Sequence, residues 1–134
     1  MAHSHKAAGP SQRMLRVGEL VRHALAELFS RGEIEDELLA GKVITVPEVR
    51  MSPDLRQASA YVMPLGGEQA AAVAEALNRH RRFIRGRIAP ALELRFVPEL
   101  RFLVDTTFEE YGRIDALLRS ERVRRDLDKD EPAE

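Results

Sequence analysis

The sequence lacks cysteine and tryptophan altogether, and only three of its 21 basic residues are lysine. The absence of cysteine excludes disulfides, thiolate metal sites and cysteine nucleophiles. Charged residues interrupt every apolar run before the roughly 18 residues that a membrane-spanning helix needs, and the first residues lack the apolar core of a secretion signal. We therefore expect a protein of the reducing cytoplasm with no membrane partner.

The residues that are present predict one globular domain. Apolar residues make up 44% of the 134 residues and charged residues 32%, which suffices for a single core and is unlike a disordered chain. We expect residues 11–120 to form this domain, residues 1–10 to be a disordered arm and residues 121–134 to be a charged tail. The arm carries His3 and His5 without a third ligand, so we predict no metal site.

The basic residues are almost all arginine, while the net charge of the chain is only −1. A partner such as nucleic acid must therefore be met by a local patch and not by the field of the whole molecule. The planar guanidinium suits phosphate groups better than a lysine ammonium does. GC-rich coding yields the same arginine bias, and composition leaves both explanations open.

The segment after the arm is predicted to be an amphipathic helix. Its apolar residues recur at intervals of three and four, Ser11 is a suitable N-cap, and Gly32 can adopt the left-handed conformation that ends a helix. Three arginines of this helix lie outside its apolar stripe: Arg13, Arg16 and Arg22. They either contact phosphates or form a solvated face balanced by Glu19 and Glu27.

An acidic loop at 33–41 leads into two β-rich segments, 42–50 and 55–63. The Met-Ser-Pro-Asp sequence at 51–54 has strong turn chemistry, so the two segments should form an antiparallel hairpin. Pro47 has no N–H to donate to a strand ladder, which places the first strand at an edge or at a bulge.

An alanine-rich run at 70–78 predicts a second helix, and its apolar pattern continues through Phe83 and Ile84. Because residues 78–82 offer no apolar side chain, we expect a break or kink there. Pro90 is expected to end the helical part.

The residues after Pro90 alternate between apolar and polar with a period of two, which is typical of a half-buried strand. Six residues make up its predicted inward face: Leu92, Leu94, Phe96, Leu100, Phe102 and Val104. Thr106 or Thr107 can cap a last helix that extends to about Glu121. This order of elements predicts a two-layer α+β sandwich with a three-stranded sheet.

No enzyme motif is present: the sequence has no phosphate-binding glycine loop, no serine elbow and no histidine pair spaced for a metal on one helix. His23 and His80 fall on different predicted helices, so we assign them no joint catalytic role. We therefore predict no catalytic activity, no small-molecule substrate and no cofactor.

An arginine cluster surrounds the predicted helix break, and it comprises five arginines and a histidine within nine residues: Arg79, His80, Arg81, Arg82, Arg85 and Arg87. No acid lies among them. Such a concentration of positive charge repels itself and is stabilised by phosphate groups, whose binding then depends on salt. A helix break also leaves backbone N–H groups available to an anion. The alternative is a solvated basic face.

Three segments together are similar to one protein family. They are Val43–Leu65, with its Ser-Pro-Asp-Leu turn and Tyr61-Val62; the triplet Phe83-Ile84-Arg85; and the Arg-Phe-Val-Pro-Glu-Leu-Arg-Phe run that begins at Arg95. The last is the most specific, because generic β patterning does not produce a proline inside a strand. In these segments the chain resembles bacterial ribosome-binding factor A, over about residues 12–118.

The resemblance implies a type II KH fold, binding to the small ribosomal subunit and its rRNA or precursor rRNA during late maturation, no catalytic activity, and a role in cold adaptation. The family usually carries an Ala-x-Gly at the kink between its two central helices, where this chain has His80-Arg81-Arg82. Such a position often needs a permissive backbone. The substitution also adds positive charge where the family meets rRNA.

These observations predict a monomeric ribosome assembly factor that binds rRNA through eight arginines: Arg79, Arg81, Arg82, Arg85, Arg87, Arg13, Arg16 and Arg22. The second hypothesis is a ferredoxin-like protein-interaction or regulatory module that binds no RNA. A third, a hydrolase of acylphosphatase type, needs an arginine and an asparagine that converge on phosphate. Asn78 is the only asparagine in the chain and a poor candidate for that role.

Overall fold

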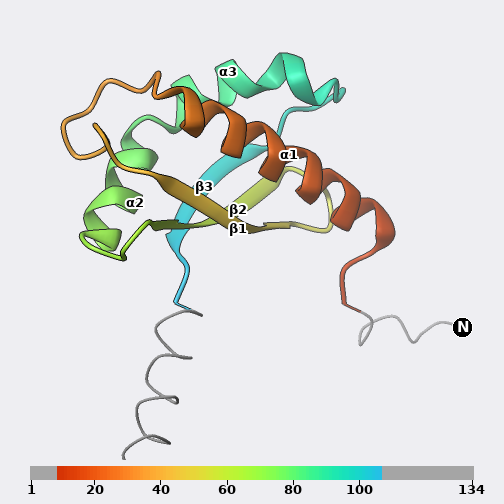
Figure 1. Ribbon diagram of the computed structural model, residues 1–134. Coiled ribbons are helices and arrows are strands. Elements are labelled where there is room, and N and C mark those ends of the chain that lie inside the picture. Colours follow the sequence, from red (N-terminus) through yellow and green to blue (C-terminus); the bar gives the residue numbers. More distant parts are fainter. Residues whose placement is uncertain (1–8, 107–134) are drawn as a thin grey trace, which may run out of the picture. The chain divides into compact units, whose positions relative to one another are not determined.

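The computed structural model describes residues 9–106, and within them six elements follow one another along the chain (Figure 1). They are α1 (Gln12–Arg31), β1 (Ile44–Met51), β2 (Gln57–Pro64), α2 (Ala70–Arg79), α3 (Arg81–Leu92) and β3 (Glu99–Val104). The chain divides into two units, Met1–Val104 and Asp105–Glu134. The last predicted helix, the predicted tail and residues 1–8 of the predicted arm lie outside the described residues.

Helix α1 begins and ends at the residues that the sequence predicts. The Ser11 hydroxyl accepts a hydrogen bond from the Met14 N–H at 3.1 Å, and Gly32 adopts a φ of 63° while its N–H donates to the Phe29 carbonyl. One stripe of the helix is buried: Val17, Gly18, Val21, Leu25 and Leu28. A Cβ on Gly18 would lie 2.9 Å from the Val49 carbonyl oxygen, so the glycine permits the close approach of α1 to β1.

Strands β1 and β2 form the predicted antiparallel hairpin. The pairing register shifts between Thr45 and Glu48, where Pro47 stands without an N–H, and β1 is an edge strand of the β1-β2-β3 sheet. At the turn, the Ser52 hydroxyl accepts from the Gln57 N–H at 2.9 Å and donates to the Asp54 carboxylate at 2.7 Å. Both alternatives predicted for Pro47, an edge and a bulge, are therefore confirmed.

Strand β3 pairs in parallel with β2, so α2 and α3 form the crossover that connects the two strands. The helices pack on one face of the sheet (Figure 1). On β2 the residues that face the helices are buried, namely Ala58, Ala60, Val62 and Pro64, and those between them are half-buried. The core lies between these two layers, where the ring of Phe102 meets that of Phe29 at 6.2 Å between centroids. The predicted two-layer α+β sandwich is confirmed.

The boundary between α3 and β3 differs from the prediction. Helix α3 continues through Pro90 to Leu92 and ends at Glu93, whose φ is 52°. Pro90 lies in the last turn of the helix, one turn after Gly86, so its missing N–H costs only the one hydrogen bond that would reach the Gly86 carbonyl. The predicted strand over 92–98 is therefore wrong, and β3 begins only at Glu99.

The burial of the apolar series changes accordingly. Leu92 is buried as a helical residue, Leu100 and Phe102 are buried in β3 as predicted, and Leu94 is half-buried. Phe96, predicted to point inward, is 45% exposed. Phe83, predicted to continue the apolar stripe of the helix, is also 45% exposed. It lies about 100° around the helix from the buried Ile84, so the two side chains cannot face the core together.

Candidate nucleic-acid interface

Helices α2 and α3 meet at His80, the single residue between them, so the predicted break exists. The His80 backbone has a φ of −101° and a ψ of 12°, a conformation open to any L residue. Its N–H donates to the carbonyls of Ala76 and Leu77 at 3.3 and 3.1 Å. The break therefore forms with His80-Arg81-Arg82 in place of two small residues, because neither Arg81 nor Arg82 adopts a left-handed backbone.

The side chain of Asn78 attaches the break to the edge of the sheet. Its Nδ2 donates to the Phe102 carbonyl at 2.9 Å, and the Phe102 N–H donates to Asn78 Oδ1 at 2.9 Å. Because β3 is the last strand of the sheet formed by residues 9–106, its outward N–H and C=O have no strand beside them in this range, and the amide side chain takes that place. Because both the nitrogen and the oxygen of its side-chain amide are engaged in this way, Asn78 has a structural role. This agrees with the expectation that it is a poor candidate for binding phosphate.

Acidic residues from the 33–41 loop neutralise part of the arginine cluster. His80 Nε2 donates to Asp36 Oδ2 at 3.0 Å, and Arg79 donates to the same oxygen at 3.3 Å. Arg87 pairs with Glu33. The hydrogen bonds from His80 and from the Leu38 N–H lower the pKa of Asp36, and the bond from Arg87 lowers the pKa of Glu33. The cluster has no acid in its own sequence, but it acquires two through the fold.

Arg85 binds the backbone of its own domain. Its guanidinium donates to the Val97 carbonyl at 2.5 and 3.2 Å and to the Pro98 carbonyl at 3.1 Å. These two carbonyls belong to the segment that connects α3 to β3, directly before β3 begins. Arg85 therefore holds α3 against this segment.

Arg81 and Arg82 differ from the rest of the cluster, because among residues 9–106 their guanidinium groups have neither the acidic partner of Arg79 and Arg87 nor the backbone partners of Arg85. Both are exposed at the first turn of α3. Together with Glu75, Asn78 and Arg79 they line an open hollow beside the break. Here two positive side chains and the N-terminus of a helix, whose dipole favours negative charge, lie together.

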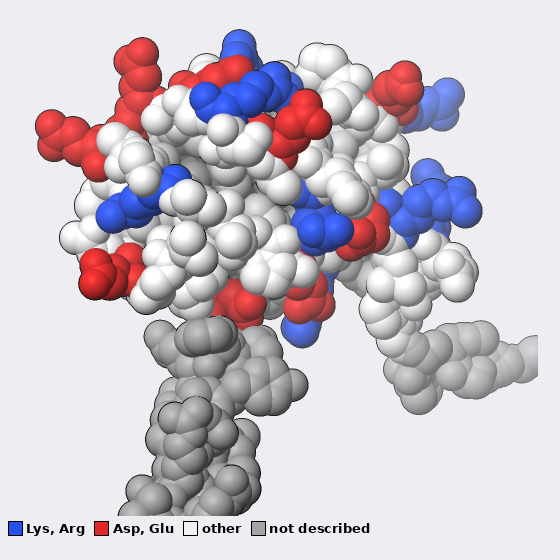
Figure 2. All heavy atoms as spheres, in the orientation of Figure 1, with Lys and Arg blue, Asp and Glu red and all other residues white. Residues whose placement is uncertain are grey.

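The arginines of α1 do not join this surface as a group. Arg22 forms two hydrogen bonds to the Glu19 carboxylate, at 2.9 and 3.0 Å, which lower the pKa of Glu19 and raise that of Arg22. Arg16 is exposed. Arg13 lines a different groove, at the C-terminal end of α3. Figure 2 shows acidic and basic side chains interspersed over the face that it presents.

Two exposed aromatic side chains were not predicted to lie on the surface. The Arg87 guanidinium lies 5.6 Å from the ring centroid of Phe83, and that of Arg56 lies 5.0 Å from the ring centroid of Phe96. Helical spacing could have identified Phe83, because Ile84 and Ile88, four residues apart, already occupy the buried face. No sequence signal separates Phe96 from a strand residue.

Within residues 9–106 no group of three histidine, aspartate or glutamate side chains could hold a metal ion. Over the same range no helix is both long and apolar enough to cross a membrane.

The topology of the chain, with its parallel β2–β3 pair connected by a broken helix pair, is that of the KH-like class of α+β proteins. The family model described as "Ribosome-binding factor A" matches residues 13–118. The chain therefore belongs to the ribosome-binding factor A family, and the ferredoxin-like fold is excluded.

Individual relatives agree with this membership. Ribosome-binding factor A of Methylobacterium sp. (strain 4-46) is 62% identical over 122 residues, which cover 91% of this chain and 88% of that protein. The Methylobacterium radiotolerans protein of the same name is 60% identical over 128 residues, which cover 96% of this chain and 90% of that protein.

A crystal structure and a fitted homology model of relatives share the fold. The crystal structure of ribosome-binding factor A from Thermus thermophilus has a TM-score of 0.57 at 26% identity and covers 68% of this chain and 94% of that one. A homology model of the Thermus thermophilus factor, fitted into a cryo-EM map of a 30S–RbfA complex, has a TM-score of 0.55 at 30% identity. That match covers 69% of this chain and 94% of the other.

Proposed function

We propose that the protein binds the small ribosomal subunit and assists late maturation of its rRNA, with the α2–α3 break contacting rRNA phosphates. It acts by binding alone, as a monomer, in the cytoplasm where ribosomes are assembled. Two findings support the proposal: the membership of the ribosome-binding factor A family, and the likeness to a relative that was fitted into a 30S–RbfA complex.

The exposure of Arg81 and Arg82 is the observation that carries the proposal. Neither guanidinium has an acidic partner among the described residues, although acids neutralise Arg79 and Arg87 close by. A phosphate that binds there gains two charge-assisted hydrogen-bond donors without displacing a carboxylate. Its binding also releases condensed counterions from the rRNA.

The other six arginines have graded roles in this proposal. Arg79 shares Asp36 with His80. Arg22 and Arg87 are in exposed ion pairs, which stabilise the fold little and can exchange for a phosphate. Arg85 positions the surface by fixing α3. Arg13 and Arg16, exposed on α1, meet rRNA away from the break.

Co-sedimentation with purified small subunits over a series of salt concentrations tests the function. The wild-type protein should pellet with the subunits at low salt, and its log affinity should fall linearly with log salt concentration. Large subunits at equal concentration are the control. Absence of binding, binding that ignores salt, or equal binding to both subunits would each refute the proposal.

A further inference from the structure

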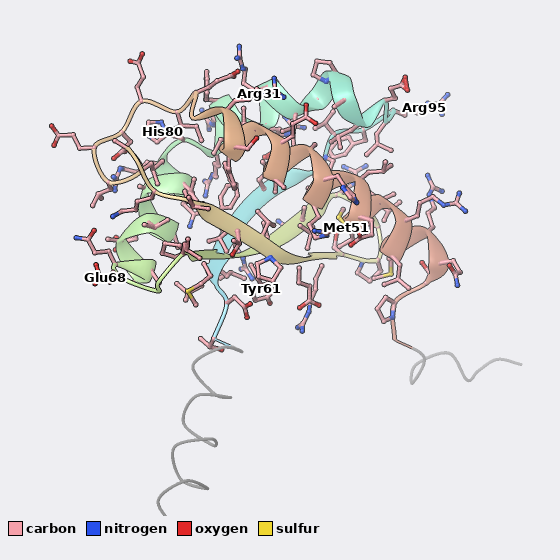
Figure 3. The ribbon with its side chains drawn as sticks, in the orientation of Figure 1. Arg31, Met51, Tyr61, Glu68, His80 and Arg95 are labelled. Carbon is pink, nitrogen blue, oxygen red and sulfur yellow. The ribbon has the colours of Figure 1, made fainter. Side chains whose placement is uncertain are left out.

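A second groove lies at the C-terminal end of α3, where the first turn of α1, the β1–β2 turn and the segment before β3 come together. Its polar and aromatic lining comprises Arg13, Asp54, Arg56, Arg95 and Phe96. Helix α3 has 12 residues and is therefore about 18 Å long, and the break lies at its other end. In Figure 3, the labelled His80 and Arg95 mark these two ends.

Phe96 gives this groove a flat apolar surface. The side chain is 45% exposed, and the guanidinium groups of Arg56 and Arg85 lie 5.0 and 5.9 Å from its ring centroid. Arg85 is itself fixed by the Val97 and Pro98 carbonyls. The ring is thus held in place by cations and not by burial, so its exposed part is available to a planar ligand.

The charge of the groove is positive. Arg13, Arg56 and Arg95 form no ion pair in the described part of the chain, although the positive charge of Arg56 is one of the causes that lower the pKa of the nearby Asp54. The one acid in the lining, Asp54, already accepts hydrogen bonds from the Ser52 hydroxyl and the Arg56 N–H. Three arginines against one engaged carboxylate favour an anionic ligand.

A comparison within the molecule shows what distinguishes this groove. Arg50 lies over the ring of Tyr61 at 5.1 Å, which is almost the geometry of Arg56 over Phe96. Arg50, however, donates to the Glu48 carboxylate at 2.8 Å, so that its charge is neutralised. The Arg50–Tyr61 pair is therefore neutralised by a hydrogen-bonded acid. The Arg56–Phe96 pair forms no such ion pair within residues 9–106, so its positive charge is available to a ligand.

We propose that this groove binds an unpaired nucleotide of single-stranded RNA, with the base stacked on the Phe96–Arg56 pair and the flanking phosphates bound by Arg13 and Arg95. Aromatic rings and guanidinium planes both stack bases, and a base in such a site is accepted with little regard to sequence. The inference rests on the proposed function and extends it: the protein contacts RNA at two points about 18 Å apart, one at each end of α3.

Two variants and a control test the inference, with a single-stranded oligoribonucleotide of mixed sequence and the small subunit as separate probes. Phe96→Leu should weaken oligoribonucleotide binding by about fivefold or more at every salt concentration and leave the salt slope unchanged, because stacking releases no counterions. Arg13→Gln with Arg95→Gln should instead reduce the slope by about 1.4, or about 0.7 per lost phosphate contact on a single strand. Arg50→Gln, the control, should behave as wild type. Thermal melts establish that each variant is folded.

The outcomes separate this inference from the proposed function. The groove proposal is overturned if both variants bind the oligoribonucleotide as the wild type does. It is also overturned if they weaken binding to the subunit alone, because the groove would then contact a ribosomal protein. The proposed function fails on a different result, namely absence of wild-type binding to the small subunit, which the oligoribonucleotide measurement does not affect.

Discussion

Asn78 and Arg85 are two polar side chains that hold the α2–α3 break beside β3. Both come from the stretch around the predicted helix break, and both bind backbone groups 12 to 24 residues further along the chain. Their structural roles are invisible in sequence, because a hydrogen bond to a distant carbonyl leaves no pattern.

Asn78→Ala should destabilise the domain by about 1–3 kcal/mol, since it leaves the N–H and C=O of Phe102 without their partner. Urea denaturation gives the free energy of unfolding. Glu75→Ala, at an exposed position of the same helix, is the control and should change stability little. Equal stability of the two variants would contradict the role assigned to the amide.

Arg85→Gln should likewise lower the free energy of unfolding, by about 1–3 kcal/mol, because the Val97 and Pro98 carbonyls lose their donor. Arg82→Gln removes the same charge from an exposed position and should leave the unfolding midpoint within experimental error of wild type. Midpoints that shift equally in both variants would mean that Arg85 is only a surface charge.

The hydrogen bonds of the Asp36 carboxylate predict that the stability of the domain falls at low pH. The folded pKa of Asp36 lies below the ordinary value because the carboxylate accepts hydrogen bonds from His80 and from the Leu38 N–H. The contribution of Asp36 to the free energy of unfolding is therefore complete above the unfolded pKa of about 3.9, and it is lost as the pH falls through the folded pKa. Urea midpoints between about pH 6 and pH 2 should therefore fall less in Asp36→Asn than in wild type. Glu37→Gln, in the same loop, should retain the wild-type fall. An Asp36→Asn curve parallel to wild type would refute the pairing.

At the level of helices and strands, local chemistry determined what could be predicted. The Ser11 cap, the Gly32 stop and the turn at 51–54 each depend on a few neighbouring residues, and all three form as expected. The end of α3 was mispredicted because Pro90 is tolerated in a last turn and because residues 92–104 keep a period of two across a helix end, a loop and a strand. Only tertiary packing decides which part of such an alternation is strand.

The two phenylalanines of that alternation give a matched test. Phe102 is 2% exposed, so Phe102→Ala should cost about 3–5 kcal/mol and nearly unfold the domain, whereas Phe96→Ala, at 45% exposure, should cost far less. Thermal melts of both variants measure the difference. Similar melting temperatures would contradict the register of β3.

Across the domain, the fold brings acidic residues next to some arginines of the cluster and leaves others without a partner among the described residues. The paired residues are 43 and 54 positions apart in the chain, yet Asp36 and Glu33 neutralise two of the five arginines, and Arg85 is used internally. A concentration of positive charge was therefore predictable, but the identity of the two arginines that keep their charge for a partner was not.

The proposed contact of Arg81 and Arg82 with rRNA phosphates is tested most directly by the salt dependence of small-subunit binding. The double variant Arg81→Gln/Arg82→Gln should remain folded, bind more weakly and lose about 1.4–1.8 from the slope of log affinity against log salt concentration. The control is Arg50→Gln/Arg101→Gln, which removes two positive charges from residues that flank Ser59 on the face of the sheet opposite α1, α2 and α3. We expect a wild-type slope for the control. A wild-type slope for Arg81→Gln/Arg82→Gln, or an equal loss in both double variants, would contradict the proposed contact.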